Sequence, residues 1–215
     1  MDYMYFVDER LNLALYTFDL GTPPFEEVRR KIEASEPPYD HPGGRDDSED
    51  DAYQEAFENA NVAIQVIGMS CVELVQTALH AFLKEFVERS FGRLLLDRVS
   101  QIKKDGWFLK FKALFATNPN YDWANSGADL DVIEQLCLTR NDFHHSVNLV
   151  TRYPYQSKKH ADKYSDSLFL NPAFCGAFMH EQPLLVTRET LQSSINEVRK
   201  LCEYIVNARC RPRPR

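Results

Sequence analysis

The chain has 215 residues, of which 44% are hydrophobic and 12% aromatic. This supply of apolar side chains is enough for one domain with a sizeable core, and it excludes a wholly disordered chain. The 8 Gly and 11 Pro exclude a collagen-like or low-complexity protein. No apolar run approaches the roughly 18–20 residues of a membrane span, and the first residues lack the pattern of a secretory signal. The 5 Cys include no C-x-x-C pair, which argues against a disulfide framework or a zinc site and favours a reducing cytoplasm.

The formal net charge of −7 is distributed unevenly along the chain. Residues 1–60 contain 16 acidic and 5 basic side chains, a balance of −11. Residues 61–215 contain 16 acidic and 20 basic side chains, a balance of +4. The overall acidity therefore does not exclude a nucleic-acid partner for the larger part of the chain.

Apolar periodicity and chain-breaking residues together predict a series of helices. In chain order these helices cover residues 1–17, 25–34, 51–89, 93–116, 128–143 and a last stretch that begins after an N-cap at Thr187. The breaks fall at Pro23-Pro24 and Gly92, and Gly106 interrupts the fourth helix. Pro, Gly and acidic residues dominate 35–50, which predicts a flexible linker. We expect residues 151–186 to be mostly irregular and the basic tail, 209–215, to be disordered.

The predicted helix 51–89 is the longest element, about 55 Å at ~1.5 Å per residue. It is apolar on several faces, which is typical of the central helix of a bundle. Because no strands alternate with helices, we expect an all-α bundle around this helix. Residues 1–50 are then an N-terminal helical extension with its acidic linker.

One stretch near the end of the fifth predicted helix concentrates residue types that carry out chemistry. Arg140 follows Ile133 and Cys137 at helical spacing, so it continues an apolar stripe. A guanidinium there is costly unless it is paired or faces a groove or an interface. One interpretation is structural: Arg140 pairs with a carboxylate such as Asp142 or Glu73, and two histidines end the helix near its negative pole.

The other interpretation comes from a resemblance to a known family. Arg140-Asn141-x-x-x-His145 is similar to the R-N-x-x-x-H form of the motif of HEPN domains, the higher eukaryotes and prokaryotes nucleotide-binding domains. Such domains are helical bundles with a long first helix. That helix often carries a Glu shortly after small residues, and Glu73, which follows Ser70 and Cys71, is in a similar position. A Gly-Trp dipeptide near the second helix is also common in the family, and Gly106-Trp107 is similar to it.

The resemblance covers residues 51–208 and implies a HEPN-like helical bundle that acts as a metal-independent endoribonuclease of a prokaryotic defence or toxin-type system in the cytoplasm. The implied reaction is attack of an RNA 2′-OH on its own phosphodiester, which leaves a 2′,3′-cyclic phosphate and a 5′-OH. In that role His145 acts as general acid or base, Arg140 binds phosphoryl oxygens, and Asn141 orients the histidine or binds phosphate. The resemblance implies no cofactor or metal.

The implied partners are RNA, a second copy whose motif faces the first across a cleft, and an antitoxin or defence-system protein. The alternative function is a non-catalytic HEPN-like module that binds nucleotide, RNA or a partner protein. In a third interpretation the chain is a helical scaffold. Some toxins of the family are silenced by a nucleotidyltransferase antitoxin, and these have a Tyr two residues after the motif His. This chain has Val147 at that position, which argues against that mode of regulation.

Two adjacent histidines compete for the place beside Arg140. At ~100° per residue of an undistorted helix, His144 lies about 40° from Arg140 and His145 about 140°. Helix geometry therefore favours His144. The family spacing favours His145, and it requires the helix to end or bend near Phe143. We assign His145 as the catalytic histidine and His144 as an auxiliary one.

The segment after the motif interleaves basic and aromatic side chains. This pattern suits single-stranded RNA, through phosphate contacts and base stacking. It suits a solvated loop with its Tyr residues packed underneath equally well. The candidate RNA-binding residues are Arg152, Tyr155, Lys158, Lys159 and Lys163. The acidic residues of the linker have two interpretations. They are simply solvated, or they cover a basic groove until RNA binds there and displaces them.

Overall fold

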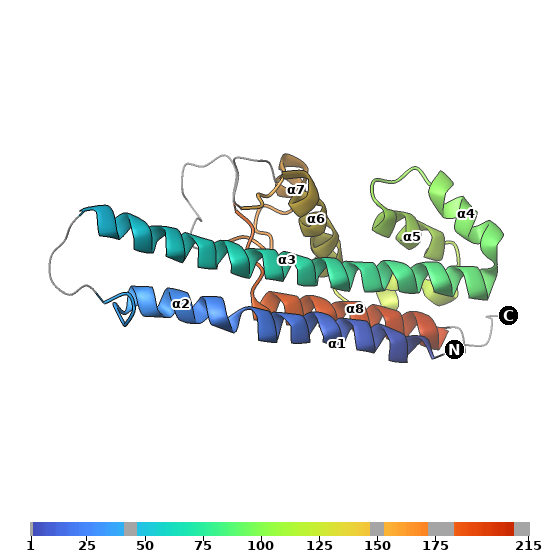
Figure 1. Cartoon of the computed structure of the whole chain (residues 1–215). Coiled ribbons are helices and arrows are strands. Elements are labelled where there is room, and N and C mark those ends of the chain that lie inside the picture. The colour runs from blue at the N-terminus through green and yellow to red at the C-terminus, as the bar shows by residue number, and fades with distance from the viewer. Residues whose placement is uncertain (1, 41–46, 147–152, 172–182, 209–215) are drawn as a thin grey trace.

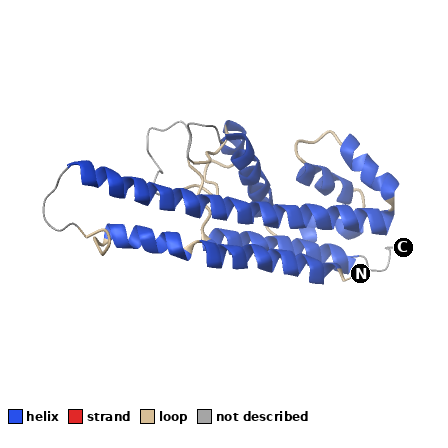
Figure 2. Cartoon of the chain, in the orientation of Figure 1, coloured by secondary structure: helices blue, strands red, loops and turns tan. Residues whose placement is uncertain are grey.

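The structure is a computed structural model that describes residues 2–40, 47–146, 153–171 and 183–208. Arg152, the middle of the predicted linker and the basic tail lie outside the described residues. The described part of the chain forms helices and no named strand (Figure 2), so the predicted all-α class is confirmed.

The elements follow one another as eight α-helices and two 3-10 turns within the described residues. They are α1 (Tyr3–Gly21), α2 (Pro23–Glu33), α3 (Asp47–Phe91), α4 (Arg93–Gln101), α5 (Trp107–Phe115), η1 (Pro119–Tyr121), η2 (Trp123–Asn125), α6 (Leu130–Ser146), α7 (Lys158–Lys163) and α8 (Arg188–Ala208). Two isolated antiparallel bridges, Tyr155 with Pro183 and Leu170 with Leu184, join the segments on either side of the undescribed residues 172–182.

The predicted breaks between helices are confirmed. Gly92 and Gly106 have φ angles of +89° and +82°, which L side chains rarely adopt, and they separate α3, α4 and α5. Three predicted boundaries were wrong by three residues or more. The first helix runs to Gly21 instead of ending at residue 17. The central helix begins at Asp47, inside the predicted linker, because acidic residue types are favoured in a first helical turn. The motif helix continues to Ser146 instead of ending near Phe143.

The long helix α3 is central, as predicted, and the other helices pack along it (Figure 1). α1 and α8 lie side by side along α3, α2 continues beside its N-terminal part, and α6 crosses it steeply. Thr187 caps α8 as predicted, because its hydroxyl accepts a hydrogen bond from the Thr190 N–H. All five residues of the predicted apolar stripe of α8 are buried: Leu191, Ile195, Val198, Cys202 and Ile205.

The first helix is part of the same core. Its buried side chains recur every three or four residues: Tyr3, Val7, Leu11, Ala14 and Phe18. Ion pairs join α1 to α8, from Arg199 to Asp8 at 2.7 Å and from Arg188 to Asp19 at 2.8 Å. The N-terminal helix that the sequence presented as an extension therefore completes the central bundle.

Gly68 allows the chain before α8 to approach α3 closely. A Cβ at this position would lie 2.7 Å from the Val186 Cβ, well inside van der Waals contact. The helix runs through Gly68 without a break. Its role is therefore packing, and it holds the segment that leads into α8 against α3.

Residues Tyr53–Phe91 of α3 are long and apolar enough to cross a membrane by length and composition. However, 56% of the most apolar window of this helix is buried inside the fold. Packing against the other helices accounts for the same apolar character, so this feature is weak evidence for a membrane span.

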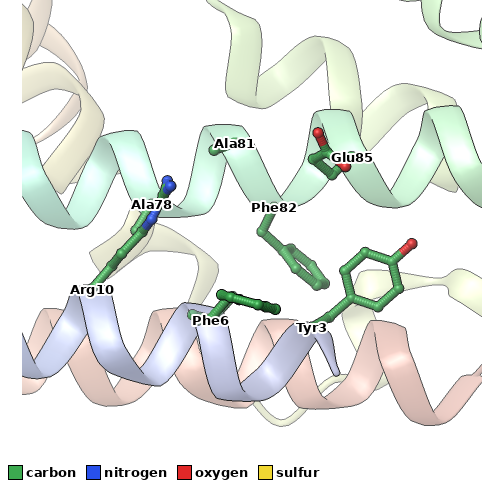
Figure 3. A pocket seen from close by; sticks show the side chains of 8 residues that line it. Tyr3, Phe6, Arg10, Ala78, Ala81, Phe82 and Glu85 are labelled. Atoms are coloured by element: carbon green, nitrogen blue, oxygen red, sulfur yellow. The ribbon is translucent and has the colours of Figure 1, made fainter. Parts of the chain in front are cut away.

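A shallow hollow of about 310 Å³ lies between α1 and α3 (Figure 3). Aromatic rings of Tyr3, Phe6 and Phe82 line it, and Arg10 extends from α1 toward Ala78. The outer face of α1 also exposes a stripe of large apolar side chains: Tyr5, Phe6, Leu13, Tyr16 and Leu20.

Candidate functional site

A carboxylate of α3 joins two motif residues of α6 in one cluster. The Arg140 Nη2 donates a hydrogen bond to the Glu73 Oε1 at 3.2 Å, and the His144 Nε2 lies 2.8 Å from the Glu73 Oε2. Arg140 and His144 are four residues apart, so both project from the same face of α6. We call these three residues the Glu73 cluster.

The Glu73 cluster lies at the surface. The side chains of Arg140, Glu73 and His144 are 30%, 36% and 38% exposed. The Arg140 Nε is buried and has no hydrogen-bond partner. The guanidinium thus keeps donor capacity beyond its bond to Glu73, and a ligand can reach the cluster from solvent.

The charge state of Glu73 follows from its surroundings. Burial raises the pKa of this carboxyl, but hydrogen bonds from His144 and Arg140 together outweigh burial, and the net pKa lies below its usual range. Glu73 is therefore an anion at neutral pH and can only accept hydrogen bonds. It follows that the His144 Nε2 carries the proton in the neutral imidazole, which leaves Nδ1 as a basic lone pair.

The structure places the two histidines differently from our assignment. Because α6 stays helical to Ser146, His144 lies beside Arg140, and the bend near Phe143 that the choice of His145 required is absent. His145 is exposed, and Asn141 is half-buried. Neither side chain makes a hydrogen bond within the described residues. The cluster therefore contains Arg140 and the auxiliary histidine, with Asn141 and His145 next to it in sequence.

Arg140 makes one of the two ion pairs that the sequence suggested for it. Arg140 pairs with Glu73, whereas Asp142 lies on another face of α6 and pairs with His160. The His160 Nδ1 lies 2.7 Å from the Asp142 Oδ2, which also accepts the Ser157 N–H at 3.2 Å. Both side chains of the pair are buried. This buried pair holds the start of α7 against the motif helix, and it was not predicted from the sequence.

The predicted RNA-binding residues do not form one open basic surface. Lys159 pairs with Asp105 at 2.9 Å, and Lys163 pairs with Glu134. Lys158 is exposed and makes no ion pair within the described residues. Tyr155 lines a cavity together with residues of α2 and α3. The positive charge of α7 is therefore largely compensated.

No group of three or more His, Cys, Asp or Glu side chains that could hold a metal ion exists among the described residues. The described cysteines, Cys71, Cys137 and Cys202, are free and buried. Burial raises the pKa of the Cys71 thiol to about 11. These thiols are thus poor nucleophiles at neutral pH.

The chain matches no protein-family model, no curated protein and no solved structure.

Proposed function

We propose that this protein is a HEPN-like, metal-independent endoribonuclease of a prokaryotic defence or toxin-type system. The observation that carries the proposal is the Glu73 cluster. It combines a permanent cation, an imidazole and an orienting carboxylate on partly exposed side chains. These three groups are sufficient for attack by a 2′-OH on the neighbouring phosphodiester.

In this reaction the His144 Nδ1 accepts the proton of the 2′-OH as the 2′-oxygen bonds to phosphorus. Glu73 holds the imidazole by its Nε2–H and stabilises the imidazolium that forms. Arg140 binds the phosphoryl oxygens as negative charge develops on them. The bond from phosphorus to the 5′-oxygen then breaks, and the leaving oxygen takes a proton from a general acid, a role that we assign to the exposed His145.

Cleavage of RNA in EDTA tests this proposal. We expect wild-type protein to leave 2′,3′-cyclic phosphate and 5′-OH ends, and Arg140→Ala and His144→Ala to lose about 100-fold or more in rate. The matched control is Arg89→Ala, which removes an exposed arginine that also pairs with a glutamate of α3. Circular dichroism verifies that each variant is folded. Full activity of Arg140→Ala would refute the catalytic role of the cluster.

The same assay with His145→Ala decides between the two histidines. If His144 is the base, its loss stops cleavage, and loss of His145, which protonates the leaving 5′-oxygen, slows strand scission as well. Loss of activity in His145→Ala with full activity in His144→Ala would restore the assignment made from the family spacing.

One observation favours the alternative, a non-catalytic HEPN-like module. Glu73 compensates the charge of Arg140, and two lysines of α7 are compensated as well. Such a module would bind RNA, nucleotide or a partner protein without cleaving RNA. Binding of RNA by wild-type protein that yields no cleavage products would support it.

A further inference from the structure

A second and larger cavity lies apart from the Glu73 cluster. It has a volume of about 540 Å³, within the range of small-molecule sites. α2 and the N-terminal half of α3 form one side, and the segments around Tyr155, Asn171 and Pro183 form the other. We call this cavity the α2–α3 pocket.

Flat side chains line much of the α2–α3 pocket. Phe57 comes from α3, and Tyr153 and Tyr155 come from the opposite side. The Arg29 guanidinium of α2 lies over the Phe57 ring, with its Cζ 5.5 Å from the ring centroid. Aromatic rings and an arginine plane are the surfaces on which proteins stack single bases.

Two amide side chains of the pocket come from one face of α3. Asn61 and Gln65 are one helical turn apart and both line the cavity. Gln65 is only 6% exposed, and its Oε1 is buried with no hydrogen-bond partner. An acceptor buried without a donor is costly to a folded protein. A ligand that brings an N–H into the pocket would remove that cost.

The wall opposite α3 is held by backbone hydrogen bonds. The Leu184 N–H donates to the Pro154 carbonyl at 2.9 Å, and the Asn171 N–H donates to the Pro183 carbonyl at 3.0 Å. The bridge between Tyr155 and Pro183 lies at the same place. These bonds set the position of Tyr155 without a ligand, so little ordering is needed when one binds.

We propose that the α2–α3 pocket binds one unstacked base of an adenine nucleotide, with the base between the aromatic side chains and its amino group donating to the Gln65 Oε1. An amide side chain offers one acceptor and one donor, which match the amino group and ring nitrogen of adenine. Arg29, whose side chain is 38% exposed and whose guanidinium lies 3.9 Å from the Glu33 carboxylate, supplies positive charge for the phosphate. Uracil can donate its N3–H to the same oxygen, but its single ring offers less surface than adenine for stacking between the aromatic side chains.

The source of the nucleotide is the RNA substrate, and this part of the inference rests on the proposed function. Gln65 and Glu73 are both on α3, about 12 Å apart along the helix at ~1.5 Å per residue. A short single strand can therefore place one base in the pocket and a phosphodiester at Arg140. The pocket would then select which phosphodiester is cleaved.

Calorimetric titration with AMP, UMP, oligo-deoxyadenylate and oligo-deoxythymidylate tests the pocket without any cleavage, because the deoxy strands lack the attacking 2′-OH. We expect AMP and oligo-deoxyadenylate to bind, and UMP and oligo-deoxythymidylate to bind about tenfold or more weakly. Gln65→Leu should weaken adenine binding by about tenfold or more. Tyr155→Ala should weaken it too, whereas Tyr155→Phe should retain it because the ring remains.

Thermal unfolding separates a binding role of Gln65 from a structural one. Because its Oε1 has no partner, Gln65→Leu should keep or raise the Tm while binding is lost. The matched control is Gln192→Leu on α8, whose amide donates to Asn196 and does not line the pocket, so this change should not affect binding. Gln65→Leu protein that binds AMP and the adenine strand as wild type does would overturn the proposal.

Two further outcomes distinguish this inference from the proposed ribonuclease. Adenine binding by a wild-type protein that never cleaves RNA would leave the pocket standing and remove the catalytic role of the cluster. AMP binding without binding of the adenine strand would show a free nucleotide as the ligand and overturn the RNA source. Failure of every adenine ligand to bind would overturn the pocket, whatever the cleavage assay shows.

Discussion

Replacement of Glu73 by Gln removes the one anion that joins Arg140 and His144. At 3.2 Å, two unit charges attract by about 5 kcal/mol at an effective dielectric of about 20. About a third of each side chain is exposed, so solvent screening and the lost hydration of both ions cancel most of this attraction. Exposed pairs retain about 0.2–1 kcal/mol. Since Glu73 also bonds His144, we expect Glu73→Gln to lower the free energy of unfolding by about 1 kcal/mol at pH 7.

The loss should depend on pH in one direction. The folded-state pKa of Glu73 lies below its usual range, so its stabilising contribution is present above the unfolded-state pKa. The contribution disappears as the pH falls through the folded-state pKa. Wild type and Glu73→Gln should therefore differ at pH 7 and converge in acid.

Urea unfolding at a series of pH values measures this difference. The matched control is Glu85→Gln, which breaks the more exposed pair of Glu85 with Arg89 on the same helix and should change stability less. Equal stability of wild type and Glu73→Gln at pH 7, or a difference that persists unchanged in acid, would refute the reasoning. The same variant should cleave RNA more slowly, because His144 loses the group that orients it.

Three other predictions concern packing and assembly. Gly68→Ala should lower the free energy of unfolding by about 1–2 kcal/mol, because overlap with Val186 outweighs the ~1 kcal/mol gain in helix propensity. Denaturant unfolding measures this change, and a more stable variant would show that Val186 can move away. Asp142→Ala should cost about 3 kcal/mol because it leaves buried His160 without its partner, whereas Asp105→Ala, which breaks an exposed pair, should have little effect on the same unfolding curve. Sedimentation velocity should show a homodimer that Arg140 variants weaken if the two motifs face one another, and a monomer at micromolar concentration with and without RNA would count against that arrangement.

The helices of this protein could be predicted from local patterns. Apolar residues every three or four positions mark the buried faces of α3 and α8, and the glycines at 92 and 106 mark where the chain must turn. These signals lie within one helix or one turn, where sequence neighbours are also neighbours in space. α6 continues to Ser146, three residues beyond its predicted end, because apolar periodicity gives little signal in a polar last turn.

The partner of Arg140 could be narrowed to two carboxylates but not chosen from the sequence. The apolar stripe required a paired or groove-facing guanidinium, and both Glu73 and Asp142 were available. The choice depends on how α6 crosses α3, which is a contact between residues 67 positions apart. That crossing places Glu73 between Arg140 and His144 and leaves Asp142 for His160.

The α2–α3 pocket exists only in the tertiary structure. Its walls come from α2, α3 and segments near residues 155, 171 and 183, and no sequence pattern links them. Gln65 appears in the sequence as one more polar residue of a long helix, and its burial without a partner becomes visible only when the other wall is in place. Side-chain type and helical phase are local properties of the chain. Which faces meet is decided by packing around the shared core, and packing brings together residues that are far apart in the sequence.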